Sequence, residues 1–122
     1  MKMFIVAAAL VLGLAAKADT SVAREIVIET KKIDDKTRWM PEKIEVSPGE
    51  RIKIVAKHEL EGGFDFHGLF IPALKITKQV NRNQPLVIET VVPATVKEGE
   101  HKVACHFHDT HVPAVLVVKA KK

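Results

Sequence analysis

The sequence predicts an all-β fold, an antiparallel β-sandwich of about seven short strands. Three observations lead to this prediction. Apolar and polar residues alternate in several short segments, which is the period of a half-buried strand. Proline and glycine occur between these segments, where turns are needed. No long segment keeps apolar residues at helical spacing, and 122 residues suit one domain with a single modest core.

The alternating segments define the expected strands in chain order. They cover residues 23–30, 43–46, 51–57, 64–72, 85–92, 99–104 and 114–119. The turn over residues 47–50 has proline and glycine where a β-turn favours them. Residues 31–40 and 58–63 are polar and are predicted to be loops. In the connection that follows the fourth strand, residues 76–80 are predicted to form a short helix.

The N-terminus has the pattern of a secretory signal peptide. Lys2 precedes an apolar run over residues 3–16, and a small-residue cleavage pattern ends at Ala18. The run is too short to span a bilayer comfortably, although an uncleaved anchor helix is the alternative. We therefore expect residues 1–18 to be a signal peptide and residues 19–122 to be one mature domain. The expected location is a bacterial periplasm, with no stable membrane insertion after cleavage.

The charge pattern argues against a nucleic-acid partner. The net charge is +4, and it falls to +2 when Lys2 and Lys17 leave with the signal peptide, since no acidic residue leaves with them. Only 5% of the residues are aromatic, and the lysines and arginines are scattered along the chain. Neither feature is typical of a surface that binds phosphate backbones or stacks on bases.

One stretch concentrates the residues that bind transition metals. Residues 105–111 contain the only cysteine of the chain and three of its six histidines. Thiolate and imidazole are ligands that copper and zinc favour, whereas calcium and magnesium prefer oxygen. In an oxidising compartment a lone thiol is a liability unless something occupies it. The alternative is a free cysteine beside solvent-facing histidines.

Three sequence segments resemble parts of one known family. Residues 41–50 resemble the opening strand of the cupredoxins and its Pro-Gly turn. Residues 65–74 resemble the segment that carries the first ligand histidine, here His67, and are especially similar to the copper domain of cytochrome oxidase subunit II. The later ligands of the family come from a Cys-x-x-His loop, which Cys105 and His108 match.

The resemblance extends from Trp39 to Lys119 and implies a cupredoxin-like antiparallel Greek-key β-sandwich. It also implies one copper ion that alternates between Cu(II) and Cu(I), with His67, Cys105 and His108 as ligands. Two imidazoles and a thiolate on a rigid sandwich serve both oxidation states with little rearrangement. Zinc bound by the same residues remains the chemical alternative.

The chain departs from the family at the axial position. Blue copper proteins place a methionine after the second histidine, but the only methionine outside the signal peptide is Met40. His111 stands where that methionine would be, and its surroundings resemble nitrosocyanin, a red-copper relative. That relative also uses a glutamate as a ligand, so Glu61 is a further, less favoured candidate. The resemblance is imperfect, because no ligand of that relative corresponds to His67. A nitrogen ligand favours Cu(II), so we expect a red or green site of low potential.

The other histidines and the aromatic residues are interpreted as structural or surface residues. His106 is expected to point away from the metal, His101 to be structural, and His58 to be exposed. The aromatic side chains are expected to pack in the core; they are Trp39, Phe64, Phe66, Phe70 and Phe107.

The favoured function is one-electron transfer to a periplasmic redox partner through an exposed imidazole flanked by Leu69 and Val112. A copper-handling or tolerance protein, with a copper donor or acceptor as its partner, is the first alternative. Accessory oxidation of ferrous iron in iron uptake is the second. An enzyme needs a vacant coordination position. Four ligand residues leave little room for one, so we expect an electron-transfer or copper-binding protein rather than an enzyme.

Overall fold

The computed structural model describes residues 23–120, which form nine strands and one short 3₁₀ turn. The expected signal peptide lies outside the described residues. The strands are β1 (Arg24–Ile33), β2 (Lys36–Met40), β3 (Lys43–Val46), β4 (Arg51–Lys57), β5 (Phe66–Ile71), β6 (Ile76–Asn81), β7 (Leu86–Val91), β8 (Gly99–Val103) and β9 (Ala114–Val118). No helix within this part of the chain is long and apolar enough to cross a membrane.

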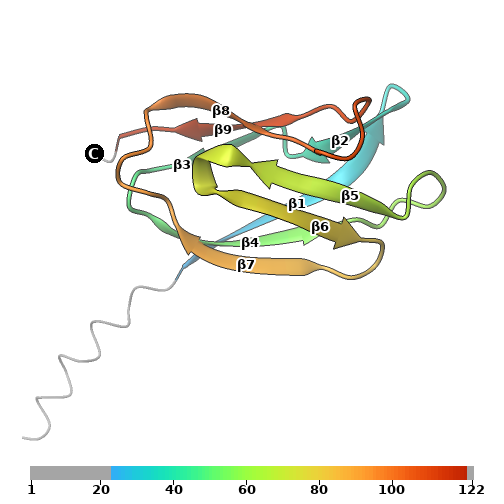
Figure 1. The fold of residues 1–122 in the computed structure, drawn as a ribbon, viewed down its shortest axis with the longest axis horizontal. Coiled ribbons are helices and arrows are strands. Elements are labelled where there is room, and N and C mark those ends of the chain that lie inside the picture. The colour runs from blue at the N-terminus through green and yellow to red at the C-terminus, as the bar shows by residue number, and fades with distance from the viewer. Residues whose placement is uncertain (1–22, 121–122) are drawn as a thin grey trace, which may run out of the picture.

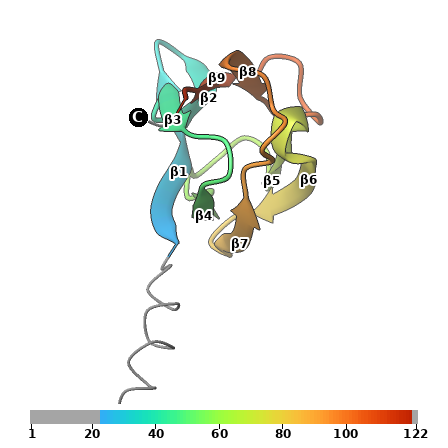
Figure 2. The same cartoon turned by 90° about the vertical axis from the view of Figure 1, so that its left-hand side faces the viewer.

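The strands form the two layers of a sandwich. One sheet has the order β2-β1-β4-β7, a second has the order β3-β9-β8, and β5 pairs with β6 in a two-stranded sheet. In the end-on view of Figure 2, β1, β4 and β7 lie opposite β3, β9 and β8, with β5 and β6 along one side. The predicted all-β sandwich is confirmed. It has nine strands rather than seven, and two of its strand pairs, β1 with β4 and β3 with β9, are parallel.

Two local predictions were wrong. The predicted loop over 31–40 is the hairpin of β1 and β2, which turns at Asp34 and Asp35 with φ of 54° and 64°. Residues 31–33 of β1 are solvent-exposed, and Trp39 is the one buried residue of β2, so no apolar alternation marks the hairpin in the sequence. The predicted helix at 76–80 is strand β6. Its buried residues, Ile76 and Val80, are four positions apart, a spacing that fits one face of a strand as well as one face of a helix.

The core lies between the layers and consists of the inward-facing apolar side chains. Strand β4 shows the pattern most clearly, since Ile52, Ile54 and Ala56 are buried while the residues between them are not. Trp39 is fully buried and is the largest side chain of the core. The predicted turn at 47–50 is confirmed, with the Glu50 N–H donating to the Ser47 carbonyl at 3.1 Å.

Three connections gather at one end of the sandwich. They are the β1–β2 hairpin, the β4–β5 loop and the β8–β9 loop, which Figure 1 shows at the end opposite the C-terminus. Backbone hydrogen bonds fix the β8–β9 loop on both sides. Phe70 and Ala104 exchange N–H···O bonds of 2.8 and 2.9 Å, and the Val112 N–H donates to the Thr37 carbonyl at 2.8 Å. This end therefore holds the cysteine- and histidine-rich stretch in a fixed position.

Candidate metal centre

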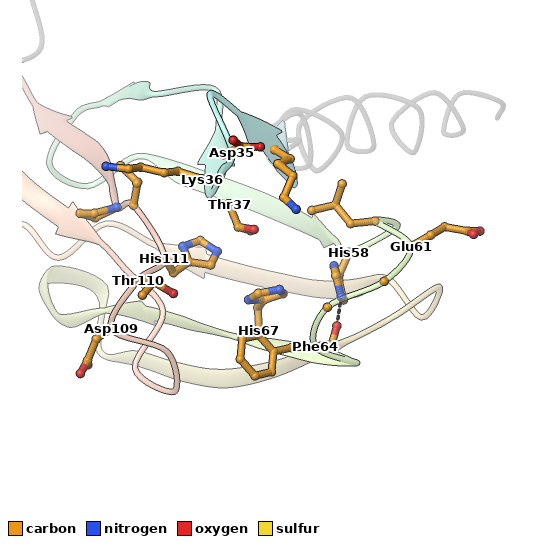
Figure 3. Close-up of a pocket in the computed structure, with 16 residues that line it drawn as sticks. Asp35, Lys36, Thr37, His58, Glu61, Phe64, His67, Asp109, Thr110 and His111 are labelled. Carbon is orange, nitrogen blue, oxygen red and sulfur yellow. Dashed lines mark hydrogen bonds between the residues drawn. The ribbon is translucent and has the colours of Figure 1, made fainter.

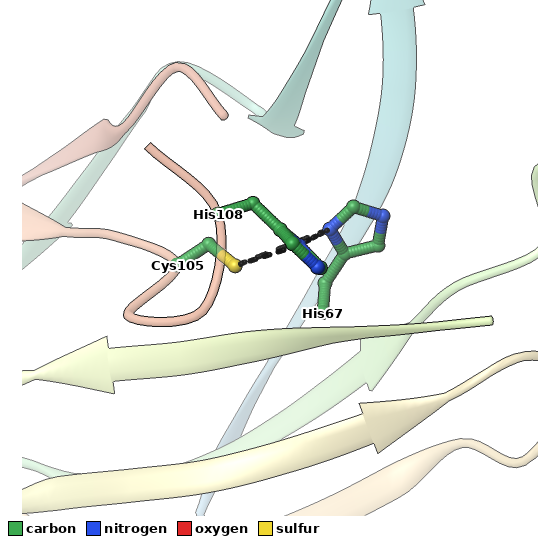
Figure 4. A group of neighbouring side chains, drawn as sticks. All are labelled: His67, Cys105 and His108. Atoms are coloured by element: carbon green, nitrogen blue, oxygen red, sulfur yellow. Dashed lines mark hydrogen bonds between the residues drawn. The ribbon is translucent and has the colours of Figure 1, made fainter. Parts of the chain in front are cut away.

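His67, Cys105 and His108 form a compact group of ligand atoms at this end of the sandwich (Figure 4). The Cys105 Sγ lies 4.0 Å from the His67 Nδ1 and 3.6 Å from the His108 Nδ1, and the two Nδ1 atoms are 3.3 Å apart. A metal bound at about 2.0–2.3 Å keeps its ligand atoms within about 4.6 Å of one another. One ion therefore fits among the three atoms.

The ligands come from two segments that are distant in sequence. His67 lies in β5, while Cys105 and His108 follow β8, and Cys105 is 38 positions from His67. The exchange of hydrogen bonds between Phe70 and Ala104 places the residue before Cys105 directly against β5. The separation of thiolate and imidazole is therefore set by sheet-like backbone pairing rather than by a mobile loop.

Gly68 organises the surroundings of the sulfur. Its N–H donates to the Cys105 Sγ at 3.1 Å, and its carbonyl accepts from the Trp39 indole Nε1 at 3.1 Å. A Cβ at this position would lie 2.4 Å from the His106 Nδ1, so only glycine allows this approach. An N–H directed at the sulfur stabilises the thiolate, the form that binds metal. The sequence prediction missed the roles of Gly68 and Trp39.

His67 is a buried, neutral imidazole. Burial is the main cause that lowers its pKa to about 3, and the nearby His111, His58, His108 and Arg82 contribute to the same shift. The ring is therefore neutral at neutral pH, and neutral imidazole is the form that ligates a metal.

His111 lies beside this group without being one of its three members. Its ring centroid is 4.9 Å from that of His67 and 5.6 Å from that of Trp39. Burial lowers its pKa to about 4. Neither of its ring nitrogens has a hydrogen-bond partner among residues 23–120. Burying a polar group without a hydrogen-bond partner costs free energy, and binding a metal ion would offset this cost. The imidazole of His111 is therefore suited to be a metal ligand.

A cavity of about 800 Å³ opens beside the group, between the β1–β2 hairpin and the loops that follow β4 and β8. Figure 3 shows His67 and His111 facing this cavity. Glu61 belongs to its rim, and its carboxylate is directed away from the histidines (Figure 3). The structure thus brings three of the expected ligands together, places His111 next to them and leaves Glu61 apart.

Several other sequence interpretations were wrong. His58 is buried rather than exposed, with 1% of its surface accessible. Phe64 and Phe107 are exposed rather than packed in the core. Leu69 is fully buried and does not flank an exposed imidazole. Such errors arise because histidine and phenylalanine occur both in cores and at sites, and only the fold decides between them.

Three phenylalanine rings surround the imidazole of His108. The Phe64 ring stacks on the imidazole with a centroid distance of 3.7 Å and an interplanar angle of 14°. Phe66 and Phe107 lie 5.9 and 6.3 Å from it. His108 is partly exposed, so these aromatic rings form an apolar surface around a ligand that reaches solvent.

The sandwich and its Cys/His group define a copper-protein fold, and the family comparison agrees. The model of the cupredoxin-like domain matches residues 3–118. The chain belongs to this family. His67, Cys105 and His108 are positioned to bind one copper ion.

Solved structures share the fold at low sequence identity. A copper nitrite reductase from Nitrosomonas europaea matches with a TM-score of 0.66 and 8% identity over 83% of this chain and 43% of that chain. The metal-binding domain of the Cu(I)-exporting P-type ATPase of Streptococcus pneumoniae matches with a TM-score of 0.59 and 17% identity, over 78% of this chain and 84% of that one.

A heme-copper terminal oxidase matches with a TM-score of 0.58 and 12% identity, over 79% of this chain and 65% of that chain. The chain thus spans less than two thirds of the oxidase and reductase chains that it matches. No curated protein matches the sequence.

Gly68→Ala tests the close approach at the sulfur. The added methyl group would strike the His106 ring and displace the N–H that faces Cys105. We expect the variant to lose most of its thiolate-to-copper charge-transfer absorption. Adding His106→Ala removes the ring atoms that the methyl group would meet, so part of the absorption should return. Unchanged absorption in the single variant would contradict this account of the sulfur environment.

The metal-free protein should lose stability on acidification. His67 and His111 have folded-state pKa values of about 3 and about 4, against an ordinary value of 6.5. The unfolded chain therefore takes up protons first, and stability falls as the pH decreases from about 6.5 toward those values. Urea midpoints measured between about pH 7 and pH 5 check this. His111→Gln should show a shallower decline than the wild type, whereas His101→Gln should keep the wild-type slope.

Proposed function

We propose that the protein is a periplasmic mononuclear copper protein that transfers one electron at a time. The carrying observation is the His67, Cys105 and His108 group, whose ligand atoms lie 3.3 to 4.0 Å apart. A ligand set of two imidazoles and a thiolate that the framework holds in place needs little rearrangement between the two copper oxidation states, and this favours electron transfer. Backbone pairing between β5 and the end of β8 makes the set rigid.

Copper, when bound, supplies the one-electron couple. The chain supplies the rest of the site. His67 offers a neutral buried imidazole, and the Gly68 N–H stabilises negative charge on the Cys105 sulfur. The partly exposed His108 and its aromatic neighbours provide the surface at which a partner would approach. An apolar contact surface excludes water without demanding a specific polar fit, which suits a transient complex.

We infer that His111 is the fourth, axial ligand. Its support is a buried imidazole in ring contact with His67, and neither of its nitrogens has a hydrogen-bond partner in the described part of the chain. A nitrogen in place of a thioether favours Cu(II) and lowers the reduction potential. Glu61 is the weaker candidate, because its carboxylate is directed away from the group.

Copper handling is the second candidate. The cavity of about 800 Å³ beside His67 and His111 favours it, since such an opening gives an ion or a partner's ligand a route to the site. Accessory oxidation of ferrous iron would need the same opening for its substrate. In the handling role the partner would be a copper donor or acceptor rather than a redox protein. The periplasmic location is inferred from the N-terminal sequence pattern.

The visible and EPR spectra of the Cu(II) protein test the axial ligand. We expect a red or green protein with a wide parallel hyperfine splitting, and an intense blue one after His111→Met. His101→Met is the matched control, because His101 bonds to the Lys97 carbonyl away from the group and should leave the spectrum unchanged. An intense blue wild type that is indifferent to His111→Met would contradict the assignment.

Voltammetry separates the two functions. An electron carrier should give a reversible one-electron wave and keep its copper through repeated cycles. A copper-handling protein should lose the ion to a competing chelator in one of the two oxidation states. Absence of any thiolate charge-transfer band in the Cu(II)-loaded protein would overturn the electron-transfer proposal and favour copper storage or zinc, because Cys105 would then lie outside the site.

A further inference from the structure

Phe64 is an exposed aromatic residue with one covered face. Its side chain has 53% of its surface accessible, yet its ring lies flat on the imidazole of His108. The centroid distance of 3.7 Å and the angle of 14° describe a parallel stack. Phenylalanine at this exposure buries little apolar surface, so packing in a core does not account for its position.

The carbonyl of Phe64 is held by two donors. The Nε2 of His58 and the Nη2 of Arg82 each lie 2.9 Å from this oxygen. Because a carbonyl only accepts, the His58 Nε2 carries a proton. Its Nδ1 is hydrogen-bonded to the Thr30 hydroxyl at 2.8 Å, deep in the structure. The position of Phe64 is therefore tied to a buried residue on one side and to a surface arginine on the other.

Arg82 holds most of the segment that precedes β5. We call residues 58–65 the Phe64 loop. The guanidinium donates to the carbonyls of Leu60 and Gly62 at 2.8 and 2.9 Å and to the Asp65 carboxylate at 2.7 Å. The Arg82 N–H also donates to the Asp65 carbonyl at 2.9 Å. The Arg82 side chain thus donates to three backbone carbonyls of the loop, those of Leu60, Gly62 and Phe64.

The Phe64 loop also contains two consecutive glycines. Gly62 and Gly63 have φ of 79° and 70° and no side chains. Two consecutive glycines lose more conformational freedom on ordering than other residues. The fork of an arginine can fix several acceptors at once, which a lysine cannot. The conformation that stacks Phe64 on His108 therefore depends on Arg82.

We propose that Arg82 is a positioning residue of the metal centre: it fixes the Phe64 loop so that Phe64 caps the His108 imidazole and slows exchange of the bound metal with solvent. The inference rests on the proposed copper function. The cap restrains the ring of His108, the partly exposed histidine of the group, and it covers one face by which a chelator would compete for that ligand. A cap of this kind suits an electron carrier, which must keep its copper ion through repeated oxidation and reduction.

Metal-free protein tests the geometry by itself. The Phe64 ring current should shift the His108 ring protons upfield in the NMR spectrum. Phe64→Ala and Arg82→Ala should both remove this shift. Arg24→Ala is the matched control, because Arg24 makes the same kind of bonds, to the Glu50 carboxylate and the Glu45 carbonyl, and pairs with the opposite end of β4. An unchanged shift in Arg82→Ala would overturn the positioning role.

Copper transfer tests the consequence. Protein loaded with Cu(I) is mixed with an excess of bathocuproine, and the rate of transfer is followed by absorbance. Phe64→Ala and Arg82→Ala should release copper roughly tenfold faster than the wild type. Arg82→Lys should give an intermediate rate, Phe64→Leu should retain part of the protection, and Arg24→Ala should match the wild type. Equal rates in the wild type and Phe64→Ala would overturn the capping role.

The two proposals can fail separately. If the wild type shows no thiolate-copper band, the proposed function fails, and the ring-current shift still decides whether Arg82 positions Phe64. If the band is present and the release rates do not differ, only the capping inference fails. Faster release in Arg24→Ala as well would assign the effect to general loosening of the fold and overturn the specific role of Arg82.

Discussion

The metal group depends on the backbone pairing of Phe70 with Ala104. This pair of hydrogen bonds joins β5 to the end of β8, which belong to different sheets of the sandwich. It places Cys105 beside His67, and the Gly68 N–H then reaches the sulfur. The bond from the Val112 N–H to the Thr37 carbonyl anchors the other end of the same loop to β2. The ligand geometry therefore follows from the sheet framework.

The same framework buries several imidazoles in a small volume. His58 and His67 meet edge to face at 4.5 Å, and His111 lies on the other side of His67. Burial of polar rings costs free energy unless each finds a partner. His58 finds two, the Thr30 hydroxyl and the Phe64 carbonyl, whereas both nitrogens of His111 remain without one among the described residues. This contrast separates a structural histidine from one suited to ligation, although the two are chemically identical.

The contacts around His108 bear on the two requirements of the proposed function, electron transfer and retention of the metal. Electron transfer needs a ligand near the surface, and retention of the metal needs that ligand to be restrained. Stacking of Phe64 on a partly exposed imidazole meets both needs, because the ring covers one face of the imidazole. The loop that carries Phe64 also borders the cavity beside His67 and His111.

The all-β class and the turn at 47–50 could be predicted from the sequence, since alternation and turn residues are local properties. Ligand type pointed to the stretch that contains Cys105 and His108, and the resemblance to the cupredoxins added His67 as a predicted ligand. Strands β2 and β6 could not be predicted, because β2 shows no apolar alternation and a spacing of four fits two periods. The tertiary structure was needed to show that His58 is buried, that Gly68 and Trp39 support the thiolate, and that Arg82 bonds to the Phe64 loop. Each of these depends on contacts between residues 17 or more positions apart, and such proximity is created by strand pairing across the sandwich.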